Sequence, residues 1–220
     1  MKTIVYVDGY NLYYGLLRNS GWKWLDLYTL FQQHVLGPGS DVAEVRYYTS
    51  PVLARLSDDP ETPVRQRLYL QALRKMPPQK IRIIEGKIVM STPFLRLVKP
   101  IPQAPEISRI QVCQLREKNT DVNLAADLIT GAWQGTYEQA VICTNDGDMT
   151  AALAVIRKHH PSISLGIVAP IPGTDHRRLS GSLMRYASWG KILSPVHLAN
   201  AQLPERIPGT SICKPEKWQK

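Results

Sequence analysis

The sequence lacks long apolar runs, because none of its hydrophobic stretches approaches the roughly 18 residues that a membrane span requires. The first ten residues are not expected to form a signal peptide, since Asp8 interrupts their apolar stretch. Cysteine is scarce: there are 3 residues and no CxxC pair, which argues against a disulfide framework or a zinc site. Cys143 lies in an apolar run and is expected to fill core space. These absences predict a cytoplasmic protein with no membrane partner.

The remaining composition is that of an ordinary globular chain. The 220 residues, 44% hydrophobic and 20% charged, suffice for one sizeable core and at most two domains. The formal net charge is +9, and the isoelectric point lies near 9.5. A basic chain favours a polyanionic partner, because cations near phosphates release counterions, although many basic proteins bind no nucleic acid.

Short apolar runs alternate with segments of helical spacing. The runs predict strands over residues 3–7, 44–49, 80–84, 140–144, 164–168 and 191–193, and the spacing predicts helices over 11–17, 25–35, 62–74, 121–133, 149–159 and 179–186. This alternation predicts an α/β fold with a mostly parallel sheet and helices on both faces. We expect one domain over residues 1–195, followed by an irregular tail over 196–220.

Residues 85–118 interrupt this pattern and are rich in proline. Two strand-like runs, 87–90 and 107–115, predict an inserted β-hairpin with a long, proline-stiffened loop. The segment is basic, so it is either a solvated loop or an arm that holds the substrate. The basic candidates for holding a polyanionic substrate in or near it are Arg96, Lys99, Arg109, Arg116 and Lys118.

Acidic residues follow two of the predicted strands. Asp8 ends the first, and Asp146 and Asp148 follow the strand at 140–144, while Asp121 opens the helix between them. In open α/β sheets ligands bind beyond the carboxyl ends of the strands, so these carboxylates are expected to converge there. Oxygen ligands of this kind suit Mg²⁺ or Mn²⁺. Taken singly, each acid also fits a turn or a helix N-cap.

Three sequence blocks resemble those of the NYN domain, a family within the PIN-like nuclease superfamily. They are VDGYNLYYG at 7–15, EKNTDVNLAADLI at 117–129 and TNDGDM at 144–149. The resemblance implies a Rossmann-like, three-layer α/β/α fold, dependence on Mg²⁺ or Mn²⁺, and RNA as the usual substrate, with DNA left open. It also brings a homodimer into consideration, because dimers are common in the superfamily.

Matched motif by motif, the resemblance implies roles for individual residues. Asp8, Asp121, Asp146 and Asp148 would hold the metal and take part in catalysis, with Asn11 as a polar catalytic partner and Lys118 on a phosphate. Asp127 also matches an acid of the middle block, but it lies six positions beyond Asp121 and points about 120° away on a helix, which predicts a supporting role.

The sequence departs from the family pattern in the loops around these acids. Thr144 and Asn145 replace the usual Ser-Gly, so they are expected to stand just behind the ligands, and Met149 replaces an aromatic residue. Asn119 and Thr120 replace a glycine-containing dipeptide ahead of Asp121. None of these departures removes an acid.

The resulting hypothesis is metal-assisted hydrolysis of RNA. Asp8, Asp121 and Asp146 would hold one ion, and Asp148 would complete its shell or bind a second. Outside the acidic site, Arg177 and Arg178 join the candidate RNA-binding residues, and some of Tyr10, Tyr13, Tyr14, Trp22 and Trp24 would stack on unpaired bases. Two alternatives stay open: a noncatalytic RNA-binding module of the same fold, and another Mg²⁺-dependent phosphate hydrolase.

Overall fold

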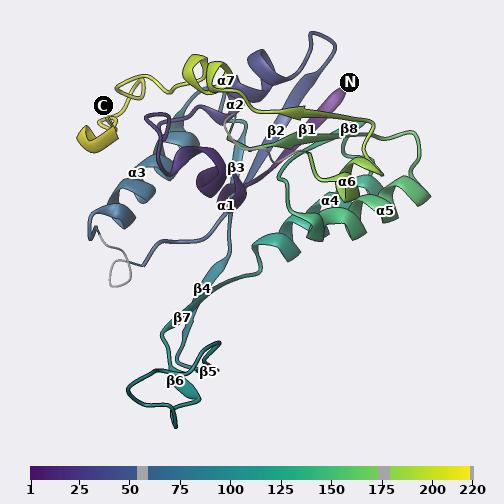
Figure 1. Cartoon of the computed structure of the whole chain (residues 1–220). Helices are drawn as coiled ribbons and strands as arrows, with labels where there is room; N and C mark the ends of the chain where they lie inside the picture. The colour runs from purple at the N-terminus through teal and green to yellow at the C-terminus, as the bar shows by residue number, and fades with distance from the viewer. Residues whose placement is uncertain (54–58, 173–178, 219–220) are drawn as a thin grey trace.

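The computed structural model describes residues 1–53, 59–172 and 179–218, and its centre is a six-stranded sheet (Figure 1). All neighbouring strands run parallel, and the order across the sheet is β10-β9-β8-β1-β2-β3. The strands are β1 (Lys2–Asp8), β2 (Asp41–Thr49), β3 (Ile81–Glu85), β8 (Gln139–Cys143), β9 (Ser164–Ala169) and β10 (Trp189–Ile192). The predicted parallel sheet is confirmed, and the strand order reverses between β1 and β8.

Alternate residues of the central strand β1 pack into two separate cores. On β1, Val5 and Val7 join one apolar cluster while Ile4 and Tyr6 join the other, and all four are buried. Because side chains alternate across a strand, a strand buried on both faces reads as a continuous apolar run. The TIVYV segment is such a run, and it identifies β1 as an inner strand.

Helices cover both faces of the sheet, which gives three layers. The first core lies under α1 (Gly9–Leu12), the π-helix η1 (Tyr13–Leu17), α2 (Leu27–Thr29), the π-helix η2 (Leu30–Val35), α3 (Thr62–Lys75) and α7 (Pro195–Asn200). The second lies under α4 (Thr120–Trp133), the 3₁₀ turn η4 (Gly147–Met149), α5 (Thr150–His159) and α6 (Gly181–Met184). The last is shorter than the predicted helix over 179–186. None of the helices in the described ranges is long and apolar enough to cross a membrane.

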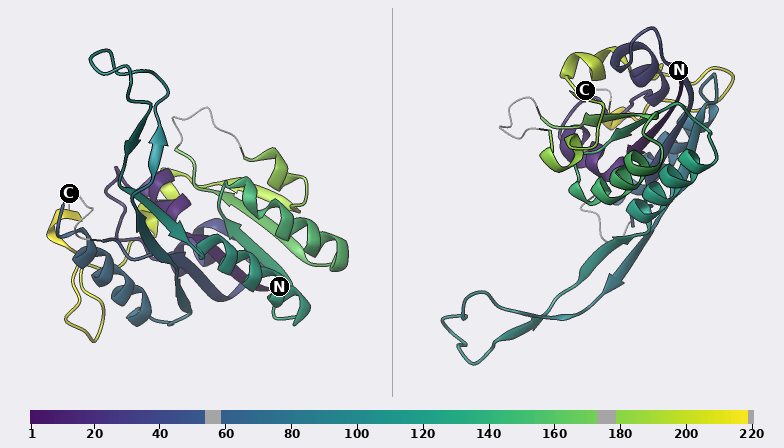
Figure 2. Two further views of the ribbon diagram at one scale, coloured as in Figure 1. Left: turned by 90° about the horizontal axis from the view of Figure 1, so that it is seen from below. Right: turned by 90° about the vertical axis from the view of Figure 1, so that its right-hand side faces the viewer.

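The predicted insertion is an arm that projects from the body (Figure 2). It holds two antiparallel pairs in succession: β4 (Lys87–Ser91) with β7 (Gln114–Lys118), and β5 (Phe94–Arg96) with β6 (Arg109–Gln111). The single strand predicted over 107–115 is therefore divided. Pro93 lies between β4 and β5 and has no backbone N–H to donate. Its carbonyl accepts from the N–H of Val112, which lies between β6 and β7, at 3.0 Å.

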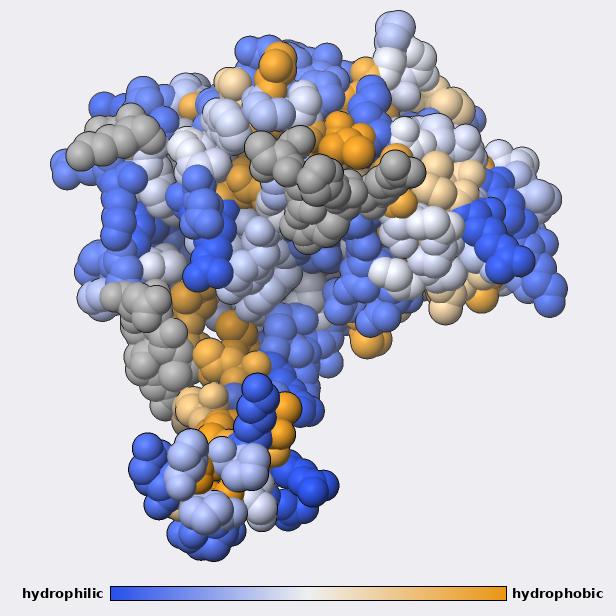
Figure 3. All heavy atoms as spheres, viewed as in Figure 1, coloured by the Kyte–Doolittle hydropathy of each residue, from blue (hydrophilic) through white to orange (hydrophobic). Residues whose placement is uncertain are grey.

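The surface of the arm mixes apolar and hydrophilic side chains. Figure 3 shows hydrophobic residues along its stem and hydrophilic residues gathered around its far end. The exposed apolar side chains of the two strand pairs include Val89, Met90, Phe94 and Leu115. A two-stranded ribbon has no second layer on which to bury such residues, so they stay open to solvent.

The tail contains one short helix and one 3₁₀ turn and packs against the body. It begins with α7, whose first turn is closed by a capping box between Ser194 and His197, and it ends in the 3₁₀ turn η5 (Glu216–Trp218). Leu198 and Ile207 are fully buried, because the tail packs back over the first core. Between α7 and η5 the tail consists of turns and isolated bridges.

Candidate active site

Asp8 lies at the carboxyl end of β1, where the strand order reverses, and it is buried. Its Oδ1 accepts from the backbone N–H of Asn11 at 2.9 Å, so the carboxylate caps α1. Its Oδ2 accepts from the hydroxyl of Thr144 at 3.0 Å. Asp8 is thus the N-cap of α1, and hydrogen bonds from two elements fix the orientation of its carboxylate.

The loop after β8 is tied to the same point. Thr144 Oγ1 accepts from the backbone N–H of Asp146 at 3.1 Å, and Asn11 Oδ1 accepts from the backbone N–H of Asn145 at 3.1 Å. Asp146 in turn caps η4 by accepting from the Asp148 N–H at 3.0 Å. Thr144, Asn145 and Asn11 therefore support this loop, while Asp148 is exposed.

Asp121 enters the site from the first turn of α4. It is not the N-cap, because the helix begins at Thr120 and Asn119 precedes it without a side-chain capping bond. Asn119 has φ of 78°, a left-handed conformation that asparagine tolerates better than most residues other than glycine. Asn119 therefore supplies the left-handed residue at the start of the helix that carries Asp121.

The carboxylates act on one another electrostatically. Burial, followed by the charges of Asp8, Glu117, Asp146 and Asp148, raises the pKa of Asp121 to about 6. Burial also raises the pKa of Asp8, against the lowering effect of its hydrogen bonds from Asn11 and Thr144, and Asp146 adds a further increase. The switch point is thus a place of concentrated negative charge.

A hard divalent cation fits the chemistry of these donors. All of them are carboxylate or amide oxygens, which Mg²⁺ and Mn²⁺ prefer, and a cation would relieve the repulsion around Asp121. In the described ranges, however, no three acidic, histidine or cysteine side chains are placed closely enough to hold an ion. The donor set fits, and its side chains would have to draw together around the ion.

Glu117, which the sequence analysis did not select, belongs to this edge. Its Oε1 accepts from Ser50 Oγ at 3.1 Å, from the Thr120 N–H at 3.1 Å and from the Thr120 hydroxyl. A Cβ on Gly86 would lie within 2.7 Å of these side-chain oxygens, so a larger residue there would displace this hydrogen-bonded group. The signal was available, since Glu117 begins the middle sequence block.

The other predicted residues lie away from the carboxylates. Asp127 Oδ2 accepts from Tyr48 OH at 2.7 Å and lies 3.9 Å from Arg46, so it belongs to the α4–β2 contact and not to the acidic edge. Its predicted support of the site is therefore not seen in these contacts. The basic candidates on the arm are all exposed: Arg96, Lys99, Arg109, Arg116 and Lys118. Arg177 and Arg178 lie outside the described residues.

The aromatic residues after Asp8 differ in their burial. Trp24 is fully buried and donates through Nε1 to the Pro204 carbonyl at 2.9 Å, so it cannot stack on RNA. Tyr14 is 58% exposed. Tyr10, Tyr13 and Tyr14 line a cavity of about 540 Å³ beside Gly9, which we call the tyrosine cavity.

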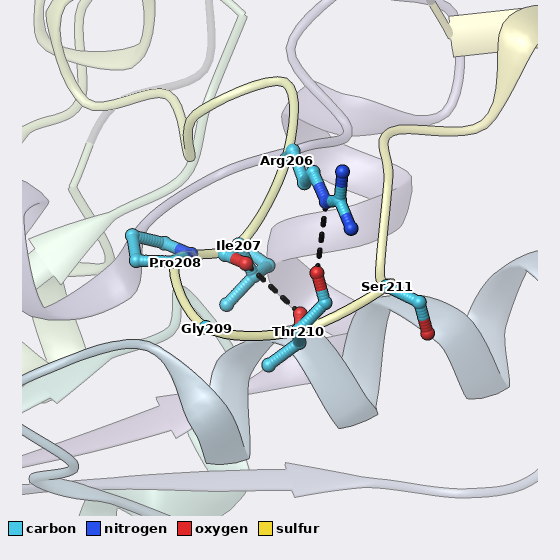
Figure 4. Close-up of a pocket in the computed structure, with 6 residues that line it drawn as sticks. All are labelled: Arg206, Ile207, Pro208, Gly209, Thr210 and Ser211. Carbon is cyan, nitrogen blue, oxygen red and sulfur yellow. Dashed lines mark hydrogen bonds between the residues drawn. The ribbon is translucent and has the colours of Figure 1, made fainter.

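A second hollow, of about 390 Å³, lies in the tail and is formed by the six consecutive residues Arg206 to Ser211 (Figure 4). Arg206 Nε donates to the Thr210 carbonyl at 2.8 Å, and the Thr210 hydroxyl donates to the Ile207 carbonyl at 2.9 Å. Its polar groups thus satisfy one another within one turn, and it brings no carboxylates together.

Comparison with known proteins agrees with the sequence motifs. The family model of the NYN domain matches residues 2–176, which include all four predicted ligands. The chain is 34% identical, over 99% of its length and 75% of the relative, to 6-hydroxy-3-succinoylpyridine 3-monooxygenase HspA of Pseudomonas putida (strain DSM 28022 / S16). A crystal structure of a protein of unknown function from Vibrio parahaemolyticus RIMD 2210633 is 16% identical, with a TM-score of 0.49 and coverage of 92% of this chain and 96% of that one.

Proposed function

This chain belongs to the NYN domain family, and from that premise we propose that it is a metal-dependent ribonuclease that hydrolyses RNA phosphodiester bonds. The observation that supports the proposal is the electrostatic coupling at the switch point of the sheet: the charges of Asp8 and Asp146 raise the pKa of Asp121, and Asp146 also raises the pKa of Asp8. In open α/β sheets this crevice is the usual ligand site.

Some residues would bind the metal ion, and others hold those ligands in place. Asp8, Asp121 and Asp146 would hold Mg²⁺ or Mn²⁺, with Asp148 at the exposed rim. A divalent ion bound to them supplies Lewis-acid stabilisation of the phosphate charge and lowers the pKa of water. Thr144 and Asn11 hold Asp8 and the β8 loop in place, as supporting residues around metal ligands generally do.

The arm supports a polyanionic substrate. Arg96 is paired directly with Arg109 across β5 and β6, and Lys87 with Lys118 across β4 and β7. Like charges opposite one another are destabilising. No ion pair joins these side chains to an acid within the described part of the chain. An RNA backbone would relieve this repulsion and release its counterions.

The test is incubation of purified protein with single-stranded RNA and with DNA of the same sequence, in Mn²⁺, in Mg²⁺ and in EDTA. We expect cleavage of RNA that depends on the ion, and mapping of the cut ends would show whether attack is internal. RNA that is bound but left intact in both metals would favour the noncatalytic module. Turnover of small phosphate esters without RNA cleavage would favour a phosphate hydrolase.

The relative named as a monooxygenase favours a second candidate function, action on a small aromatic compound, because the identity extends over 99% of this chain. The tyrosine cavity is compatible with such a substrate. Incubation with 6-hydroxy-3-succinoylpyridine, O₂ and NADH, followed by mass spectrometry, tests it. A product with one added oxygen atom would support this candidate, and an unchanged substrate would contradict it.

A further inference from the structure

The tyrosine cavity lies next to the acidic edge but is built from different residues. Gly9, Thr49 and Glu117 mark its border with that edge. The remaining lining comes from α1, from η1 and the loop after it, from β2 and the segment that leads to α3, from α3 itself, from the base of the arm and from the tail. Its volume of about 540 Å³ falls in the range of roughly 300–1,000 Å³ that is common for small-molecule sites. None of the four predicted metal ligands lines it.

Two groups of aromatic rings form its walls. Tyr13 and Tyr14 meet edge to face, with their centroids 5.2 Å apart. Tyr69 meets Trp218 of the tail in the same way at 6.2 Å, and Tyr69 OH donates to the Leu25 carbonyl at 2.8 Å. Rings held by their own packing and hydrogen bonds present rigid, flat surfaces, which suit a planar ligand.

The lining holds two acids, Asp59 and Glu117, and two cations, Lys23 and Arg18, and cations outnumber acids once the two that hold Asp59 are counted. Asp59 is already bound by Arg65 and Lys217. Lys23 Nζ donates to the Ser20 carbonyl at 2.9 Å, and no ion pair joins it to an acid in the ranges that the structure describes. Burial and the neighbouring cations Arg65 and Lys217 lower the pKa of Lys23, so an anion beside it would be stabilised.

Arg18 adds a second cation to the same cavity. Its guanidinium lies 5.5 Å from the centre of the Tyr14 ring, and no acid in the described ranges pairs with it. A guanidinium stacked on a ring keeps its N–H edges available to a carboxylate. The cavity therefore combines flat apolar walls with two cations that no carboxylate within the described residues neutralises.

We propose that the tyrosine cavity binds a small planar aromatic carboxylate, with its ring between the two aromatic walls and its carboxylate on Lys23 and Arg18. The proposal rests on the same cavity as the second candidate function and does not depend on RNA cleavage, because none of the four predicted metal ligands lines the cavity, although Glu117 of the acidic edge does. The chemistry that selects the ligand is the pairing of an aromatic ring with a single negative charge.

The test is isothermal titration of the whole chain in EDTA, without RNA, using three probes. They are 2-naphthoate, its neutral amide 2-naphthamide, and cyclohexanecarboxylate, which keeps the charge but has no planar ring. We expect saturable binding of 2-naphthoate and affinities at least about tenfold lower for the other two, since each lacks one element of recognition.

Lys23→Gln and Arg18→Gln should each weaken 2-naphthoate binding by about tenfold, whereas Lys158→Gln, at an exposed position on α5, should leave it unchanged. Thermal unfolding of each variant checks its fold, and Arg18 is exposed, so its replacement should not affect folding. Absence of saturable 2-naphthoate binding, or equal affinity in wild type and both glutamine variants, would overturn the proposal. Because metal and RNA are omitted, that failure would leave the ribonuclease proposal untouched.

Discussion

The hydroxyl of Thr144 donates to Asp8 Oδ2 at 3.0 Å, which joins the carboxyl ends of β8 and β1 where the strand order reverses. Both side chains are buried, so the bond is shielded from water. The same hydroxyl accepts from the Asp146 N–H, and one side chain therefore sets the positions of two acids that come from different strands.

Removal of that hydroxyl should damage both stability and activity. Thr144→Val leaves a buried carboxylate oxygen and a backbone N–H without their partner, which costs roughly 1–3 kcal/mol in the free energy of unfolding. Metal-dependent RNA cleavage should fall at least about tenfold, as it does when supporting residues of metal ligands are removed. Urea unfolding and initial rates measure these effects. Thr144→Ser is the control and should keep most of the activity; equal losses in both variants would argue against the hydrogen bond.

The raised pKa of Asp121 predicts a pH dependence of the metal-free protein. Because the folded state binds this proton with a pKa of about 6, against an ordinary aspartate value of 3.8, stability should fall as pH rises through roughly 4 to 6. Asp121→Asn should flatten that fall and raise the unfolding free energy at pH 7.5 by about 1 kcal/mol, or roughly 3 °C, after allowance for solvent screening. Thermal unfolding in EDTA from pH 4 to 8 measures it, and an identical slope in both proteins would contradict the charge cluster.

Gly9 is required by close packing at the start of α1. A Cβ there would lie 2.5 Å from the Tyr48 carbonyl oxygen and 2.9 Å from the Tyr47 ring. Gly9→Ala should therefore lower the free energy of unfolding by about 1–3 kcal/mol. Gly37→Ala is the matched control, because nothing lies within 4 Å of its Cβ position. A Gly9→Ala protein as stable as the control would show that β2 can move away from this loop.

The paired arginines of the arm should govern the salt dependence of RNA binding. Replacement of Arg96 and Arg109 by glutamine should reduce the slope of log affinity against log salt by about 1.4 for single-stranded RNA, or about 0.7 for each phosphate that an arginine neutralises. Fluorescence anisotropy measures the slope. It is carried out in EDTA, which removes the metal that the proposed cleavage needs and leaves Asp8 unchanged. The double variant Lys75→Gln/Lys158→Gln has the same charge change on exposed helix positions and should keep the wild-type slope. Two equal slopes would remove the arm from the RNA site.

The central sheet could be predicted from the sequence because its strands are buried on both faces. The runs TIVYV and AVICT became β1 and β8, and the acids that follow them lie at one edge. Asp8 and Asp146 could be selected for the same reason, since parallel strands place their carboxyl ends together, whereas Asp121 was selected at the start of a helix.

Contacts between distant segments could not be predicted. Although Glu117 begins the middle sequence block, its hydrogen bonds with Ser50 and Thr120 depend on the course of β7 back to the body, which no periodicity records. Trp218 packs against Tyr69 from the far end of a proline-rich tail, and no local pattern in the sequence predicts this contact. The motif predicted that Asp127 supports the site, whereas its carboxylate accepts a hydrogen bond from Tyr48 OH in the contact between α4 and β2.

The most direct test of the proposed ribonuclease is the initial rate of Mn²⁺-dependent cleavage of single-stranded RNA by Asp8→Asn against wild type. Asparagine keeps the shape of Asp8 and, through its amide oxygen, an acceptor for the Asn11 N–H, while its NH₂ group would donate to the Thr144 hydroxyl oxygen; it also removes a buried charge, so the variant should fold in EDTA. We expect its cleavage rate to fall at least about a hundredfold, with RNA binding retained. A folded Asp8→Asn protein that cleaves RNA at the wild-type rate would contradict the assignment of the acidic edge as the catalytic site.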